Sequence, residues 1–276
     1  MRKNYICFMI LFPPAKINLG LNILRKREDA YHDIDTCMVE IPFTDILEVT
    51  KADSFEFLQT GITISGIGGT NLCEKAYQLL RREYEIGPVY IHLRKQIPVG
   101  AGLGGGSADA TYTLLALNQL FHLQLSLQKL KELSSELGSD CPFFIEGLPQ
   151  IAQGRGEELS TIELDLSKFY LVLLNPGIHV GTKEAYDCVS INNAAVSVHE
   201  TLQKPIQQWC DLLKNDFETS VFQLYPEIQK LKESLYESGA SYAAMSGSGS
   251  SVFGIFSAEQ QALNYQSPHL IYKGRF

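Results

Sequence analysis

The first part of the chain carries short apolar runs, and several of them alternate with polar residues. Such alternation is typical of β-strands that bury one face. We expect strands over residues 5–12, 15–24, 44–52, 54–66 and 89–97. These segments predict that the first part of the molecule is rich in β-sheet.

Helical periodicity marks the segments between and after these strands. Three of these segments begin with a residue that can cap a helix: Asn71, Ser107 and Ser126. Two of them reach a glycine that could end the helix, Gly87 and Gly138. Leu114, Leu115, Leu117, Leu120 and Phe121 give the second helix a buried stripe. We expect helices over residues 71–87, 107–122, 126–138, 199–213, 216–224 and 226–237, and a short one within residues 181–189.

The second half of the chain adds two strand signals. Residues 169–177 predict a strand that ends in a tight turn, and residues 241–257 predict a strand, a glycine-rich turn and a second strand. The mixture of helices and strands predicts an α+β protein with two lobes, residues 1–160 and residues 161–276.

Composition narrows the possible partners. The chain has 276 residues, with 23 Lys and Arg against 31 Asp and Glu, so its net charge is −8. An acidic chain without a basic run is a poor match for nucleic acid. We also expect no membrane partner, because no later segment approaches the roughly 20 apolar residues of a membrane span. The six cysteines form no C-x-x-C pair, which favours reduced thiols and a cytoplasmic protein.

The segment IPVGAGLGGGSADAT, residues 97–111, predicts a binding site for phosphate groups. Glycines let the backbone approach a phosphate closely and adopt positive φ. The N–H groups at the start of the following helix are unpaired, and the helix dipole favours an anion there. Ser107 could cap this helix, and its hydroxyl could reach a phosphate or a metal ion.

Three other interpretations of this segment fit less well. A Walker A loop needs Lys before its Ser or Thr, and this segment contains no Lys. A dinucleotide fingerprint needs an acidic residue about 20 positions later in a βαβ unit, and neither is clear. A flexible linker does not explain Pro98 before the glycines and a strong helix directly after them.

The glycine segment resembles the phosphate loop of the GHMP kinases, a superfamily that includes galactose, homoserine, mevalonate and phosphomevalonate kinases. Four more segments extend the resemblance along the chain: PPAKINLGLNIL, RKREDAYHDIDT, GSDCPFFIEG and AMSGSGSSVF. Together they are similar to one branch of this superfamily, whose acceptor is a cytidyl alcohol of the non-mevalonate isoprenoid pathway. The resemblance implies a two-lobed α+β fold, with an N-terminal lobe like domain 2 of ribosomal protein S5.

The resemblance also implies ATP and Mg²⁺ as cofactors and phosphorylation of the 2-hydroxyl of the cytidyl substrate. Transfer of a phosphoryl group needs positioning, charge neutralisation and a group that accepts the hydroxyl proton. The family places the base at Asp140 and its cationic partner at Lys16. By spacing alone, Asp140 could equally be a turn residue and Lys16 a solvent-facing lysine.

The same resemblance assigns binding residues. In RKREDAYHDIDT it implies that Tyr31 and His32 bind the cytosine, although the pair could equally pack and cap within a loop. Asn71 could bind near the adenine or cap a helix, and Lys95 could bind ATP or be a solvated charge. The other substrate positions are Asn18, Thr182 and Tyr186. The other ATP positions are Pro98, Val99, Gly100, Ala101, Gly102, Leu103, Gly104, Gly105, Gly106, Ser107 and Ala108.

Two competing functions stay open at this point. Another GHMP kinase, acting on homoserine, mevalonate or a sugar, would keep the phosphate loop but would not need the pair Tyr31 and His32. A non-catalytic nucleotide sensor would keep the fold but would not need Lys16 and Asp140. The protein ligands of Mg²⁺ and the oligomeric state are not predicted by the sequence.

Overall fold

A computed structural model describes residues 8–29, 31–62, 70–187, 189 and 196–276, without the side chains of Thr182 and Asp187. The chain forms two compact units that are interleaved in sequence. Unit 1 comprises residues 1–15, 43–99 and 105–147, and unit 2 comprises residues 16–42, 100–104 and 148–276. The predicted division into consecutive lobes at residue 160 stays a prediction.

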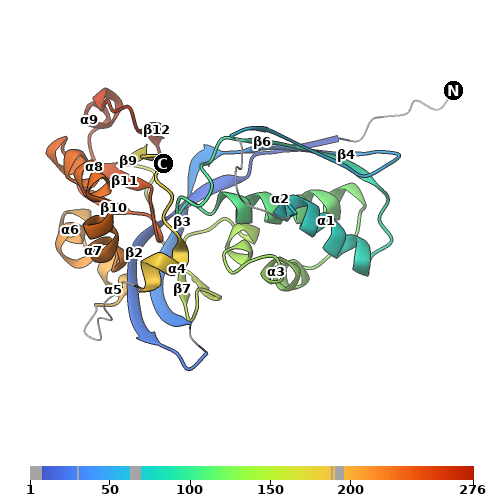
Figure 1. Cartoon of the computed structure of the whole chain (residues 1–276), viewed down its shortest axis with the longest axis horizontal. Helices are drawn as coiled ribbons and strands as arrows, with labels where there is room; N and C mark the ends of the chain where they lie inside the picture. The colour runs from blue at the N-terminus through green and yellow to red at the C-terminus, as the bar shows by residue number, and fades with distance from the viewer. Residues whose placement is uncertain (1–7, 30, 63–69, 188, 190–195) are drawn as a thin grey trace. The chain divides into compact units, whose positions relative to one another are not determined.

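Unit 1 contains a four-stranded sheet in the order β1-β4-β6-β5. β1 (Phe8–Leu11), β4 (Ile46–Lys51) and β6 (Val89–Lys95) are antiparallel, and β5 (Glu56–Gly61) is parallel to β6. The helices α1 (Leu72–Glu83) and α2 (Gly105–Leu120) lie along one face of this sheet (Figure 1). The apolar side chains between sheet and helices form the core of this unit, which includes Leu47, Val49, Leu80, Ile91, Leu93 and Leu117.

The helix predicted from residue 71 begins as expected and ends earlier than expected. The Asn71 side chain accepts a hydrogen bond from the N–H of Cys73 at 2.8 Å, and Glu74 accepts one from the N–H of Asn71 at 3.1 Å. This reciprocal pair is a capping box. Tyr84 is extended and ends the helix, so the prediction that Gly87 would end it is wrong.

The start of α2 corrects a second prediction, since Ser107 is the third residue of the helix rather than its cap. Gly105 begins the helix because its backbone packs closely on the preceding strand. A Cβ at Gly105 would lie 2.8 Å from a methyl of Ile97 and 2.9 Å from Nζ of Lys95. Only glycine leaves room for the first turn of α2 at this position.

Unit 1 is completed by α3 (Leu127–Ser135) and the 3₁₀ helix η1 (Cys141–Ile145). Ser126 caps α3 as predicted, because its hydroxyl accepts the N–H of Lys129 at 3.2 Å. The helix stops at Ser135, before the predicted Gly138. Both α3 and η1 pack against α2, so α2 is the central helix of this unit.

Most of β2 (Pro14–Lys26) and β3 (His32–Thr44) belongs to unit 2, where they form a sheet in the order β2-β3-β7-β8. β7 (Gln150–Gln153) and β8 (Glu158–Thr161) complete it. The hydrophobic pattern did not predict β3, because the acidic residues Asp35 and Glu40 interrupt its alternation. Asp35 is nevertheless buried, where it accepts the N–H of Val198 at 2.9 Å.

A second antiparallel sheet in unit 2 has the order β10-β11-β9-β12. β9 (Tyr170–Leu174), β10 (Tyr242–Met245) and β11 (Val252–Phe256) match the predicted strands, whereas β12 (Leu270–Arg275) was not predicted. The helices α7 (Phe217–Leu224), α8 (Pro226–Glu237) and α9 (Glu259–Asn264) contribute to its core. α4 (Thr182–Asp187) is the predicted short helix.

The helix predicted over residues 199–213 is broken into three pieces. They are α5 (Val198–Leu202), the 3₁₀ helix η2 (Ile206–Gln208) and α6 (Trp209–Leu212). Pro205 lies between the first two, and a proline has no N–H to continue the helical hydrogen bonds. Within the part of the chain that the structure describes, no helix is both long and apolar enough to cross a membrane.

Candidate active site

The glycine loop of unit 2 has three glycines in the left-handed region. The φ angles are 64° at Gly100, 78° at Gly102 and 66° at Gly104. Gly102 also lies against the backbone of the segment SGSGSS, residues 246–251, which we call the third motif. A Cβ at Gly102 would be 1.9 Å from the carbonyl oxygen of Ser246. Both the conformation and the close approach require glycine at this position.

The third motif supports this loop directly. The Ser246 hydroxyl donates to the carbonyl of Gly102 at 2.8 Å, and its oxygen accepts the N–H of Asn18 at 3.3 Å. The N–H of Ser251 donates to the carbonyl of Ala101 at 3.2 Å. Asn215 holds the motif from behind, since its side-chain amide donates to the carbonyls of Met245 and Gly247, both at 2.8 Å. The loop conformation therefore depends on two motifs far apart in the sequence.

In unit 1, the segment after this loop forms the first turn of α2. Gly105, Gly106 and Ser107 contribute backbone N–H groups that have no partner within the helix. Pro98 and Val99 precede the loop and belong to the same unit. This turn therefore offers the donors that the sequence predicted for an anion.

Asp140 lies on the turn between α3 and η1, where its side chain makes no capping hydrogen bond to the helix. The four residues that follow, Cys141, Pro142, Phe143 and Phe144, are all buried. Their packing holds the turn in place and leaves the carboxylate partly exposed. Asp140 therefore lies in a turn, and its role as the base stays a prediction.

Two hydroxyls of α2 contact the residue that follows Asp140. The Thr111 hydroxyl donates to the carbonyl of Cys141 at 2.9 Å. Burial raises the pKa of the Cys141 thiol to about 11, while hydrogen bonds with Ser107 and Thr111 lower it in part. The thiol is therefore protonated at neutral pH, and α2 holds the turn of Asp140 through neutral hydrogen bonds.

Lys95 is buried rather than solvated. Its ammonium donates to Oδ2 of Asp109 at 2.6 Å and to a carboxylate oxygen of Asp45. Burial alone would lower the pKa of Lys95, but the carboxylates of Asp109 and Asp45 outweigh this effect and raise it. The ammonium therefore stays charged and joins β6, α2 and the residue before β4. A contact between Lys95 and ATP stays a prediction.

In unit 2, Lys16 and Asn18 are buried neighbours on β2. The Lys16 ammonium donates to Oδ1 of Asn18, and the Asn18 amide donates to the Thr36 hydroxyl at 3.0 Å. The alternative of a solvent-facing lysine is therefore wrong. A buried ammonium held by an amide is a preorganised positive charge.

His32 and Tyr186 lie together although they are far apart in the sequence. Their rings stack with centroids 4.8 Å apart and an angle of 16° between the planes. Burial and the charge of Lys26 lower the pKa of His32, so the imidazole is neutral at pH 7. A neutral imidazole can both donate and accept a hydrogen bond. Thr182, the other residue of α4 predicted to bind substrate, has a side chain outside the described residues.

Tyr31 has different surroundings from its neighbour His32. Its side chain is 58% exposed, and the guanidinium carbon of Arg155 lies 5.2 Å from the centre of its ring. Arg155 is placed by the tight turn between β7 and β8, where both Gly154 and Gly156 have positive φ. Sequence reasoning did not single out Arg155. The sequence signal that could have pointed to Arg155 is its position between Gly154 and Gly156.

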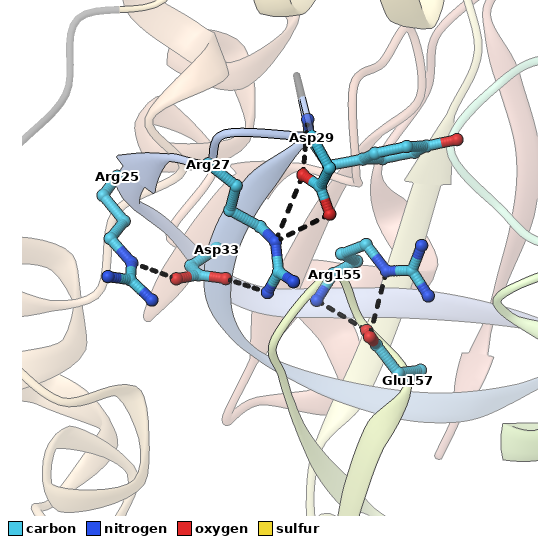
Figure 2. A network of polar contacts seen from close by, with 7 residues as sticks. Arg25, Arg27, Asp29, Asp33, Arg155 and Glu157 are labelled. Carbon is cyan, nitrogen blue, oxygen red and sulfur yellow. Dashed lines mark hydrogen bonds and ion pairs between the residues drawn. The ribbon is translucent and has the colours of Figure 1, made fainter.

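Figure 2 shows the charged side chains around the β2–β3 hairpin and the neighbouring turn. Arg27 bonds Asp33 at 2.8 Å and Asp29 at 3.2 Å, and Arg25 also bonds Asp33. On the neighbouring turn, Arg155 bonds Glu157 at 3.0 Å. The pairs of Arg25 and Arg27 lie across the β2–β3 hairpin, which carries Tyr31 and His32.

Comparisons with known proteins show the family to which the chain belongs. Residues 71–147 match the model of the GHMP kinases N terminal domain, and residues 194–267 match that of the GHMP kinases C terminal. A 4-diphosphocytidyl-2-C-methyl-D-erythritol kinase from Cytophaga hutchinsonii is 47% identical over 95% of this chain and 97% of its own length. One from Bacteroides fragilis is 48% identical over 92% of this chain and 94% of its own length.

Solved structures give the same result. The crystal structure of a 4-(cytidine 5'-diphospho)-2C-methyl-D-erythritol kinase matches with a TM-score of 0.80 and 34% identity, covering 92% of each chain. Phosphomevalonate kinase from Streptococcus pneumoniae shares the fold at a TM-score of 0.70, with 15% identity and coverage of 99% and 100% of the two chains. The fold and the motifs define a GHMP kinase. Within that superfamily, the chain belongs to the family of the 4-diphosphocytidyl-2-C-methyl-D-erythritol kinases.

Proposed function

We propose that this protein transfers the γ-phosphoryl group of ATP to the 2-hydroxyl of 4-diphosphocytidyl-2-C-methyl-D-erythritol, in the cytoplasm. The name and the high identity of its relatives support this substrate. The observation that carries the proposal is the Asp140 turn. Its carboxylate is partly exposed, whereas the four residues that follow it are buried. The turn lies beside the first helical turn after the glycine loop. This is the arrangement that transfer to an alcohol needs.

Asp140 is the base in this mechanism. It accepts the proton of the substrate hydroxyl while that oxygen forms a bond to the γ-phosphorus. The bond from the γ-phosphorus to the bridging oxygen breaks at the same time, and ADP leaves with the electron pair. Lys16 supplies positive charge for the developing alkoxide, and Asn18 fixes the direction of its ammonium.

The nucleotide is held by the glycine loop and the first turn of α2. The loop backbone approaches the phosphates, and the unpaired N–H groups of Gly105, Gly106 and Ser107 donate to them. Asn71 and Lys95 complete the proposed nucleotide residues. The structure assigns both side chains to interactions within unit 1, so their contact with ATP rests on the family resemblance.

Mg²⁺ is the second proposed cofactor, and it neutralises phosphate charge when it is bound with ATP. Among the described residues there is no cluster of three or more His, Cys, Asp or Glu side chains that could hold a metal ion. This fits an ion held mainly by the phosphates and water, as Mg²⁺ commonly is. The Ser107 hydroxyl is the candidate protein ligand in the phosphate-binding turn.

The cytosine is bound by the aromatic residues of unit 2. Because His32 is neutral, its imidazole can hydrogen-bond the polar edge of the base. Tyr31 and Tyr186 offer aromatic faces for stacking. Asn18 and Thr182 are the remaining proposed substrate contacts.

A coupled assay of ADP release tests this function. The purified protein with Mg²⁺ and ATP is compared on the cytidyl substrate, homoserine, mevalonate and galactose. Turnover only with the cytidyl substrate is expected. Turnover only with one of the others would keep the kinase and overturn the pyrimidine site. Binding of ATP without turnover on any of the four would favour a nucleotide sensor.

A further inference from the structure

Thr111 makes an unusual hydrogen bond for a threonine within a helix. It lies in α2 and is fully buried. Hydroxyls at such positions commonly donate to a carbonyl four residues earlier in the same helix. Thr113, equally buried and two residues later, does this and donates to the carbonyl of Asp109 at 2.7 Å. The Thr111 hydroxyl instead leaves its helix and donates to the carbonyl of Cys141.

Cys141 directly follows Asp140, and its carbonyl accepts the hydrogen bond from Thr111. On its other side, the N–H of Cys141 donates to the carbonyl of Gly138 at 3.1 Å. The backbone next to Asp140 is therefore tied to the helix whose first turn presents the N–H groups for phosphate.

We propose that Thr111 is a positioning residue that sets the direction of the Asp140 carboxylate. This inference rests on the proposed role of Asp140 as the base. Thr111 itself contacts neither substrate nor nucleotide in this scheme. It fixes the distance from the α2 turn to the base, because one end of its hydrogen bond is in α2 and the other is in the Asp140 turn.

The effect on the rate follows from geometry. A displacement of about 1 Å from the reactive arrangement can reduce a rate by about 10²-fold. Loss of the Thr111 bond leaves the buried Cys141 carbonyl without this donor, so the turn has a reason to shift. The backbone N–H groups of the phosphate-binding turn take no part in this bond. We therefore expect a loss in kcat with little change in KM for ATP.

Four variants test the inference by steady-state kinetics. Thr111→Val keeps the shape and removes the hydroxyl, and Thr111→Ser restores it. Thr113→Val is the matched control, since it removes an equally buried hydroxyl from the same helix. Asp140→Asn tests the base itself. We expect Thr111→Val to lower kcat by about 10- to 100-fold with KM for ATP within about twofold. Thr111→Ser should recover most of the loss, and Thr113→Val should stay near the parent kcat.

Two outcomes for the threonine variants would overturn this inference directly. The first is an equal loss of kcat in Thr111→Val and Thr113→Val, and the second is a higher KM for ATP at unchanged kcat. Should Thr111→Val not fold, the pair Thr111→Ala and Thr113→Ala makes the same comparison. If Asp140→Asn loses most of its kcat but the Thr111 variant has the same kcat as the Thr113 control, the positioning role of Thr111 is rejected and the role of Asp140 as the base is kept. An unchanged kcat in Asp140→Asn would reject the base and, with it, this inference.

Discussion

The Lys95 ammonium lies 2.6 Å from Oδ2 of Asp109, and solvent reaches neither side chain. Asp45 bonds the same ammonium, and its second oxygen accepts the N–H of Ile97 at 2.9 Å. One cation thus joins the end of β6, the start of α2 and the residue before β4. Such a buried charge is costly to leave unpaired.

Replacing Lys95 tests how much its ion pairs with Asp45 and Asp109 contribute to the stability of unit 1. Lys95→Met leaves two buried carboxylates without their partner, so we expect the free energy of unfolding to fall by about 3–5 kcal/mol. Urea denaturation followed by circular dichroism measures it. Lys75→Met on the exposed side of α1 is the control and should change the free energy by less than about 0.5 kcal/mol. A loss below about 1 kcal/mol in Lys95→Met would contradict the interpretation.

Asp140→Asn removes the proposed proton acceptor while keeping size and shape. We expect kcat to fall by about 10²- to 10⁴-fold, as for loss of general base catalysis, with ATP still bound. Steady-state kinetics and a nucleotide-binding titration measure the two effects. Asp165→Asn, at an exposed position, should leave both unchanged. Nearly intact turnover in Asp140→Asn would show that another group takes the proton.

His32→Ala distinguishes the base site from the nucleotide site. We expect KM for the cytidyl substrate to rise by about 10-fold or more, since the side chain offers a hydrogen bond to the base, and KM for ATP to change little. His199→Ala at an exposed position is the control. An equal loss of affinity for both ligands would make His32 a structural residue.

The same ring predicts a pH dependence. Burial and Lys26 lower the pKa of His32, so the imidazole is neutral above the usual histidine range and gains a proton only at lower pH. KM for the cytidyl substrate should be flat between about pH 7 and 8 and rise on acidification below about 6.5. His32→Ala should remove this rise, and a parent protein with no rise down to pH 5 would contradict the role of the neutral ring.

Gly102→Ala tests the contact of the two glycine motifs. The added Cβ would lie 1.9 Å from the carbonyl of Ser246, so the loop must move and KM for ATP should rise by about 10-fold or more. Gly177→Ala is a close control, because Gly177 has a similar φ of 74° but nothing within 4 Å of the added Cβ. This control separates the effect of the clash from the effect of placing alanine at a positive φ. Equal KM values in the two variants would mean that the clash is relieved at no cost to ATP binding.

Glu40→Gln tests the pH dependence of stability. Burial raises the pKa of Glu40 to about 7, and its Oε1 has no hydrogen-bond partner within the described part of the chain. The folded protein then keeps a proton that the unfolded chain has already released above about pH 4.5, so stability falls as the pH rises from about 4.5 to 7. We expect Glu40→Gln to be more stable than the parent by about 2 kcal/mol at pH 8. Denaturation at pH 5 and pH 8 measures the difference, with exposed Glu85→Gln as control. No gain at pH 8 would contradict the prediction.

Local rules account for much of the fold. The Asn71 and Ser126 caps were predictable because a cap depends on neighbouring residues only. The break at Pro205 and the strand β3 were missed for different reasons. In the first case, the helical periodicity of the side chains continues through Pro205, although the missing N–H of this proline breaks the helix. In the second, the acidic residue Asp35 is buried because it bonds the N–H of Val198, a partner that only the folded chain brings close.

The class of chemistry can be predicted from the amino-acid sequence. The phosphate loop, the Asp140 turn and the strand that carries Lys16 are each defined by neighbouring residues, so their resemblance to the GHMP kinases is visible in short segments, whereas the burial of Lys16 is not. Which groups act on one another depends on the folded structure. It placed the Ser246 hydroxyl on the carbonyl of Gly102, 144 residues away in the chain, and it surrounded Lys95 with two carboxylates. The physical reason is that burial and charge pairing depend on distance in space, and residues distant in the chain meet only when the core has formed.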